Sequence, residues 1–166
     1  MALQAEENLA KKIPATSYVF PPVDLMKKPK AKQMQMNEHQ LQQKAALLEN
    51  TLQNFHVDAR VLNVTQGSSV TRYEVQPAVG VKVSSITKLA DDIALNLRAK
   101  SIRIEAPIPG KAAVGIEVEN EKPDMVSIRE LIDSKEFRNA SSKISFAVGK
   151  DISGRNVIAN LKEMPH

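Results

Sequence analysis

The chain has 166 residues, with 23 Lys and Arg against 19 Asp and Glu, and 42% of its residues are hydrophobic. This composition is typical of a globular domain and excludes collagen-like and disordered classes. The absence of cysteine excludes disulfides, thiolate zinc sites and cysteine nucleophiles. No apolar run reaches the roughly 20 residues that cross a bilayer, the N-terminus lacks the apolar stretch of a signal peptide, and the three histidines lack metal-ligand spacing.

Residues 1–36 are expected to form a linker. They contain four prolines and a lysine-rich run at 27–32, and proline breaks both helices and sheets. The stretch Tyr-Val-Phe-Pro-Pro at 18–22 predicts a short extended segment that docks on the domain. The lysine-rich run is interpreted as a solvated tether, with contact to phosphates as the alternative.

A first helix is expected at about 38–55. Asn37 suits the N-cap position, and Gln40 lies three residues further on, as in a capping box. The apolar stripe spans barely two heptads, so packing against a sheet is favoured over a coiled coil. The stripe consists of Leu41, Ala45, Leu48, Leu52 and Phe55.

Alternating residues then predict a hairpin with strands at about 57–65 and 70–76. In its second strand, Tyr73 and Val75 are expected to face the core, whereas Arg72 and Glu74 face water or each other.

A second helix and a second hairpin are expected next. The helix is predicted to begin at a cap formed by Ser84 or Ser85. The strands are expected at 101–106 and from Val114 onward, joined by the rigid turn at 107–110. The buried stripe of the helix is expected to be Ile86, Leu89, Ile93 and Leu97.

The last third repeats this pattern. A capping box at 127–130 predicts a helix to about Phe137, followed by strands near 144–148 and 157–161. The expected fold is therefore α+β, with an antiparallel or mixed sheet built from hairpins and with helices packed on one face. The expected division is a linker at 1–36, a main subdomain at 37–140 and the last strands at 141–166.

No group of residues in the sequence indicates catalysis. The Gly-Lys pairs at 110–111 and 149–150 are not followed by Ser or Thr and open no predicted helix, so neither is expected to be a phosphate loop. The adjacent Asp91 and Asp92 do not face each other on a helix. We expect no catalytic, cofactor-binding or metal-ligating residue.

Several motifs, in this order, resemble the FtsK/SpoIIIE family of DNA translocases. The string IRIEAPIPGK at 102–111 is the longest, and the resemblance covers about residues 18–166. Two places depart from the family pattern, Ser68-Ser69 in place of Pro-Thr and Glu119 in place of Pro, and neither alters a catalytic position. The motifs lie at 71–74, 80–83, 89–94, 102–111, 114–118, 134–137, 149–154 and 161–166.

The resemblance implies the α subdomain of a motor that moves double-stranded DNA through a hexameric ring, in chromosome segregation during cell division or sporulation. It implies a motor on the cytoplasmic side of the bacterial inner membrane, at the division septum. ATP and Mg²⁺ would bind a RecA-like β subdomain, which would follow His166 with its Walker A loop. The implied partners of this segment are double-stranded DNA, further copies of the chain and that β subdomain, with no membrane contact.

Four basic residues are candidates for the DNA channel or the interface between subunits, and a solvated surface position is the competing interpretation of each. Two alternative functions stay open: a standalone interaction module that modulates full-length rings, and a fragment that retains weak nucleotide binding. The four candidates are Arg72, Lys82, Arg103 and Lys111.

Overall fold

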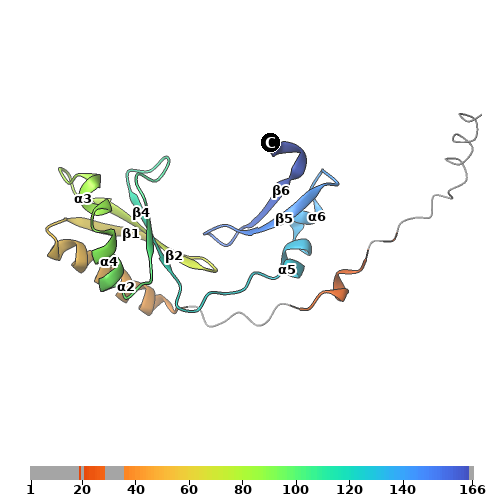
Figure 1. Ribbon diagram of the computed structural model, residues 1–166, viewed down its shortest axis with the longest axis horizontal. Coiled ribbons are helices and arrows are strands. Elements are labelled where there is room, and N and C mark those ends of the chain that lie inside the picture. Colours follow the sequence, from red (N-terminus) through yellow and green to blue (C-terminus); the bar gives the residue numbers. More distant parts are fainter. Residues whose placement is uncertain (1–18, 20, 29–35, 165–166) are drawn as a thin grey trace, which may run out of the picture.

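The structure is a computed structural model, and it describes residues 19, 21–28 and 36–164. Two structural units, each a sheet with helices, are joined by an extended segment at 120–127 (Figure 1). This arrangement confirms the α+β fold expected from the sequence. The elements are η1 (Val23–Leu25), α2 (Glu38–Asn54), β1 (Ala59–Gln66), β2 (Val70–Pro77), α3 (Val83–Thr87), α4 (Ala90–Asn96), β3 (Ile102–Glu105), β4 (Val114–Glu119), α5 (Ile128–Ile132), α6 (Lys135–Arg138), β5 (Ser145–Lys150), β6 (Asn156–Asn160) and η2 (Leu161–Glu163).

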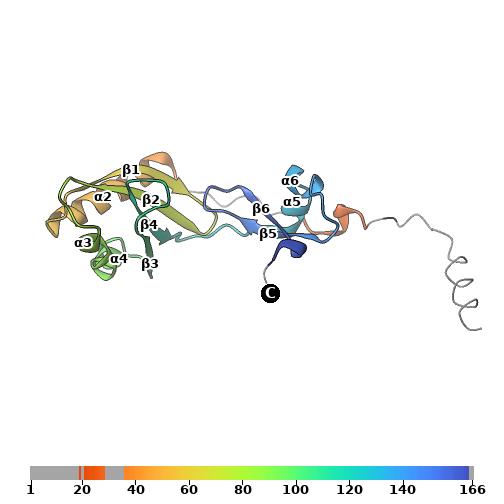
Figure 2. The same cartoon turned by 90° about the horizontal axis from the view of Figure 1, so that it is seen from above.

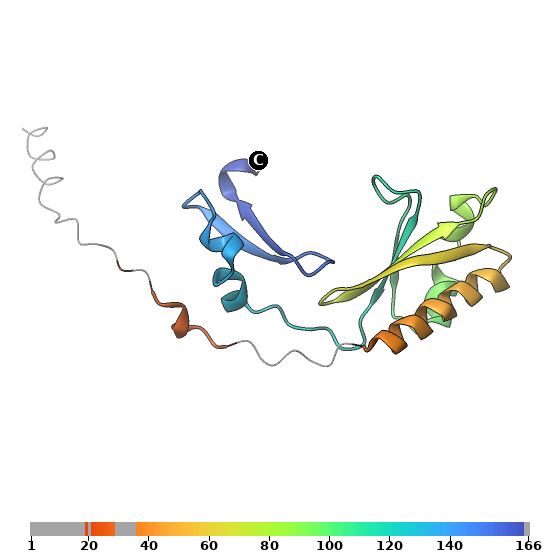
Figure 3. The ribbon, with the colours of Figure 1, turned by 180° about the vertical axis from the view of Figure 1, so that it is seen from behind.

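The first unit is built on an antiparallel sheet with the strand order β1-β2-β4-β3. Helices α2 and α4 pack on one side of this sheet, with α2 running beside β1 (Figure 3), and α3 adds the buried Ile86 to the same core. Every second residue of a strand points to the helices, so Tyr73, Val75 and Ile116 form the sheet side of the core. The helices contribute Leu48, Leu52, Ile86, Ile93 and Leu97.

Helix α2 begins as the sequence predicts. The Asn37 side chain accepts a hydrogen bond from the Gln40 amide at 2.8 Å, and the Gln40 side chain accepts one from the Asn37 amide at 3.1 Å. This capping box satisfies two backbone donors that have no partner within the helix.

We expect Asn37→Ala to lower the free energy of unfolding by about 1 kcal/mol, because it removes the acceptor at the helix start. Asn50→Ala, at an exposed position inside the same helix, is the matched control and should cause no loss. Urea denaturation followed by circular dichroism measures both. Equal effects of the two substitutions would contradict the capping argument.

The single helix predicted after the first hairpin is two short helices, α3 and α4. Residue 82 is the N-cap of α3 and makes no side-chain cap, so the cap predicted at Ser84 or Ser85 is wrong. The break falls at Lys88 and Leu89, yet Ile86 and Ile93 are both fully buried. Two short helices that present one face to the sheet keep the periodicity of one long helix, which explains the error.

The second unit is a two-stranded sheet, β5 and β6, with α5 and α6 packed on it. Glu130, the residue that would complete the predicted capping box, instead pairs with Lys150 of β5, and Ser127 makes no cap. Ser134 caps α6 by accepting a hydrogen bond from the Phe137 amide at 3.3 Å. The boundary expected at 140 falls between α6 and β5, which pack together in this unit.

The two units meet at the tips of their hairpins, which lie side by side in both views (Figures 1 and 2). Gly67 is buried there, and a Cβ added to it would lie 2.8 Å from the carbonyl oxygen of Ile152. The connecting segment also holds the first tip, because the amides of Asn120 and Asp124 donate to the carbonyls of Ser69 and Ser68 at 2.9 and 2.8 Å. The carbonyls of Ser68 and Ser69 make these contacts, so the contacts do not depend on the two serine side chains.

Because of Tyr73, the first unit is expected to lose stability at alkaline pH. Burial raises the pKa of Tyr73 to about 12, whereas an exposed tyrosine titrates near 10. The stability from keeping this phenol neutral is present below pH 10 and is lost as the pH rises toward 12.

We therefore expect the free energy of unfolding to fall by about 3 kcal/mol more over this window in the parent chain than in Tyr73→Phe. The difference between the two proteins isolates the phenol from the lysines that titrate in the same range. Parallel loss of stability in both proteins would exclude Tyr73 as the cause.

Candidate interaction surface

The face of the first sheet opposite its helices carries a ladder of charged residues. The strand register aligns Arg72 of β2, Glu117 of β4 and Arg103 of β3 in one row across the sheet. The neighbouring row aligns Glu74 of β2, Gly115 of β4 and Glu105 of β3. Directly opposed residues of antiparallel strands lie close enough for their side chains to interact.

Arg72 is the centre of this ladder. Its guanidinium forms an ion pair with Glu105 and lies 3.6 Å from the Glu117 carboxylate, which is itself buried. Arg103 approaches the other oxygen of Glu117 at 3.5 Å. The Arg72 side chain is 16% exposed and that of Arg103 is 76% exposed, so the two arginines share a carboxylate from very different environments.

Gly115 makes room for Arg72. A Cβ at this position would lie 2.9 Å from Nη2 and 3.0 Å from Nε of Arg72, so the guanidinium passes over the bare backbone of β4 on its way to Glu105. The Nε atom of Arg72 is buried and has no hydrogen-bond partner among the described residues. A glycine inside a strand is a sign of such a close approach, so Gly115 is the residue from which this arrangement could have been inferred.

Lys111, from the turn between β3 and β4, completes the charged face. Its ammonium contacts both carboxylate oxygens of Glu74 at 2.7 Å. The ladder thus combines three cations with three carboxylates, Glu74, Glu105 and Glu117, and its net charge is zero.

The structure therefore brings together three of the four basic residues singled out in the sequence. Lys82 lies elsewhere, exposed at the start of α3. Sequence reasoning did not predict that Arg72 pairs with Glu105 and Glu117, since both are far from it along the chain. Contact of any of the four with DNA or with another subunit stays a prediction.

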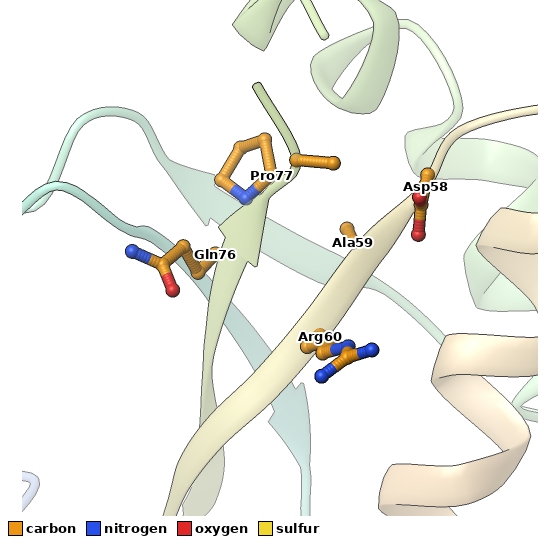
Figure 4. A pocket seen from close by; sticks show the side chains of 6 residues that line it. Asp58, Ala59, Arg60, Gln76 and Pro77 are labelled. Atoms are coloured by element: carbon orange, nitrogen blue, oxygen red, sulfur yellow. The ribbon is translucent and has the colours of Figure 1, made fainter.

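One shallow depression of about 210 Å³ lies at the far end of β1 and β2, and Asp58, Arg60 and Gln76 are among its lining residues. Arg60 and Gln76 extend in opposite directions in Figure 4, so their polar groups do not converge. Within residues 21–28 and 36–164, no group of three or more acidic or histidine side chains could hold a metal ion. The helices in the same part of the chain are too short and too polar to cross a bilayer.

The comparisons with known proteins agree with each other. The family model of the FtsK alpha domain matches residues 20–120. A DNA translocase FtsK of Clostridium tetani is 50% identical over 165 residues, which cover 98% of this chain and 22% of the relative. A DNA translocase SftA of Bacillus subtilis is 53% identical over 150 residues, which cover 90% of this chain and 16% of the relative.

The chain thus spans about a fifth of the length of these relatives. The family match ends at residue 120, where the first sheet gives way to the extended segment, so it includes the whole structural unit that carries the charged ladder and ends where that unit ends. The match covers more than half of the chain, and the chain therefore belongs to the FtsK alpha domain family.

Proposed function

We propose that this chain is the non-catalytic α subdomain of a motor that translocates double-stranded DNA, and that it supports assembly of the ring and of the DNA channel. The observation that carries the proposal is about 50% identity, over 90% or more of the chain, to proteins named DNA translocases. ATP and Mg²⁺ would act in a separate β subdomain of the same motor.

The contacts and the exposure of the four basic candidates support different roles for them. Arg72 and Lys111 already contact carboxylates closely, and a phosphate would have to displace those partners. We assign these two to the structure of the subunit and to the interface between subunits. Lys82 and Arg103 are well exposed, and they are our candidates for sequence-neutral contacts with DNA phosphates.

Fluorescence anisotropy with a random-sequence DNA duplex tests the contact with phosphates. We expect binding that weakens steeply with salt, and the slope of log K against log salt should fall by about one unit in Lys82→Ala or Arg103→Ala. Lys143→Ala, an exposed lysine of the second unit, is the matched control and should leave the slope unchanged. No salt-dependent binding, or equal slopes in all variants, would overturn the proposed DNA contacts.

Analytical ultracentrifugation over a range of protein concentrations tests the assembly role. A concentration-dependent shift from monomer to a closed oligomer is expected, and a monomer at every concentration would contradict it.

Titration with labelled ATP tests whether nucleotide binding belongs to a separate subdomain. Saturable binding of ATP by this chain would contradict a non-catalytic role and would favour a fragment with its own nucleotide site.

A further inference from the structure

The segment before α2 docks on the second unit, although more than a hundred residues separate the two in sequence. Arg129 of α5 donates a hydrogen bond from Nη1 to the carbonyl oxygen of Met26 at 2.8 Å, and its Nη2 forms an ion pair with Asp24. One guanidinium thus binds a side chain and a backbone carbonyl of the same segment. The planar fork of arginine suits this two-point contact, which a lysine would not reproduce.

The segment is shaped for this contact. Pro22 fixes its own φ, and the turn η1 follows at once, with amides of Leu25 and Met26 donating to the carbonyls of Pro22 and Val23 at 3.1 Å. Val23 and Met26 are half-buried, whereas the Leu25 side chain points to solvent with 76% of its surface exposed. The turn therefore presents Asp24 and the Met26 carbonyl to Arg129 in a fixed geometry.

Burial distinguishes the two partners of this ion pair. The Arg129 side chain is only 15% exposed, but that of Asp24 is 84% exposed. The arginine thus belongs to the second unit, and the segment lies over it from outside. Such a contact can open without unfolding either sheet, because few bonds hold the segment and the Asp24 side chain is exposed.

We propose that residues 22–26 form a releasable strap, held on the second unit by Arg129, so that this unit rather than the first sheet anchors the N-terminal part of the chain. In the docked state, a pull on the chain before Pro22 reaches α5 through Arg129. In the released state, the same pull reaches the first unit at α2. The strap therefore determines whether a pull on the chain before Pro22 acts on the second unit or on the first.

The natural absence of cysteine allows a direct test, because introduced cysteines are the only sites for thiol-reactive spin labels. Labels at Leu25→Cys and Lys135→Cys, both exposed, report the distance from the strap to the second unit by pulsed electron paramagnetic resonance. We expect one narrow distance distribution in the parent chain. In Arg129→Ala it should become at least twofold broader and shift to longer distances.

Arg138→Ala is the matched control, because Arg138 is an arginine of the same unit that pairs with Asp133 and not with the strap. It should keep the narrow distribution. A second label pair, Lys135→Cys with Ser153→Cys, lies within the second unit and detects any unfolding caused by Arg129→Ala.

Asp24→Lys makes the test independent of the folding of the second unit. Asp24 is exposed, so its replacement disturbs no core, yet it places a cation beside Arg129 and should broaden the distribution between residues 25 and 135. A narrow distribution that persists in Asp24→Lys, or equal distributions in Arg129→Ala and Arg138→Ala, would overturn the strap. Neither result depends on DNA binding or ring assembly.

Discussion

Replacing Arg72 with alanine is expected to lower the free energy of unfolding of the first unit by about 3 kcal/mol. The substitution removes the ion pair with Glu105 and leaves the buried Glu117 with the largely exposed Arg103 as its remaining cation in the ladder. A buried charge that loses its partner cannot regain its hydration, and the loss exceeds what the pair contributed in the first place. Urea denaturation followed by circular dichroism measures the effect.

Arg103→Ala is the matched control, because Arg103 contacts the same carboxylate from a largely exposed position. It should change the free energy of unfolding by less than about 0.5 kcal/mol. The double variant Arg72→Met with Glu117→Gln should recover part of the loss, since it removes the charges at both positions. Equal costs of Arg72→Ala and Arg103→Ala would show that the ladder contributes nothing through burial.

Truncating Ile116 to alanine is expected to cost about 4 kcal/mol, the largest effect of any single substitution considered for this chain. Ile116 is fully buried on β4, and the register places it between Tyr73 of β2 and Ile104 of β3. Removing its side chain leaves a cavity that two paired strands and the helices above them cannot close.

Leu62→Ala provides the comparison, because Leu62 is an aliphatic residue at the β1 irregularity and 58% of its surface is exposed. Its truncation should cost less than about 1 kcal/mol. Thermal and urea denaturation of both variants, at a pH below the titration of Tyr73, measure the contrast. A cost for Ile116→Ala as small as that for Leu62→Ala would contradict the position of the core.

The stripe of α2 shows how far local periodicity reaches. Leu48 and Leu52 were expected in the core and are fully buried, and Tyr73 and Val75 of β2 were assigned to the buried face correctly. Phe55 belongs to the same stripe but is the C-cap residue, and it is half exposed. Periodicity identifies the buried side of an element, whereas its ends depend on what the neighbouring elements cover.

Capping shows the same limit. Asn37 forms its capping box, and among the described residues Gln40 makes no competing side-chain contact, whereas Glu130 pairs with Lys150 instead of Ser127. Lys150 lies on a strand that follows the helix, and its approach is a property of how α5 packs on β5. The same sequence signature therefore gives a cap at one helix and none at the other.

The amino-acid sequence by itself determined the strands, the first helix, the α+β class, the inward-facing residues of α2 and β2, and the family. Each of these is carried by residues close together in the chain or by strings such as IRIEAPIPGK. Only the tertiary structure decided which charges meet. Arg72 pairs with two carboxylates through the strand register and the space above Gly115, and Arg129 binds a segment about a hundred residues away. A cation can pair with any carboxylate that folding brings near it, so the pairing is fixed by packing and not by spacing along the chain.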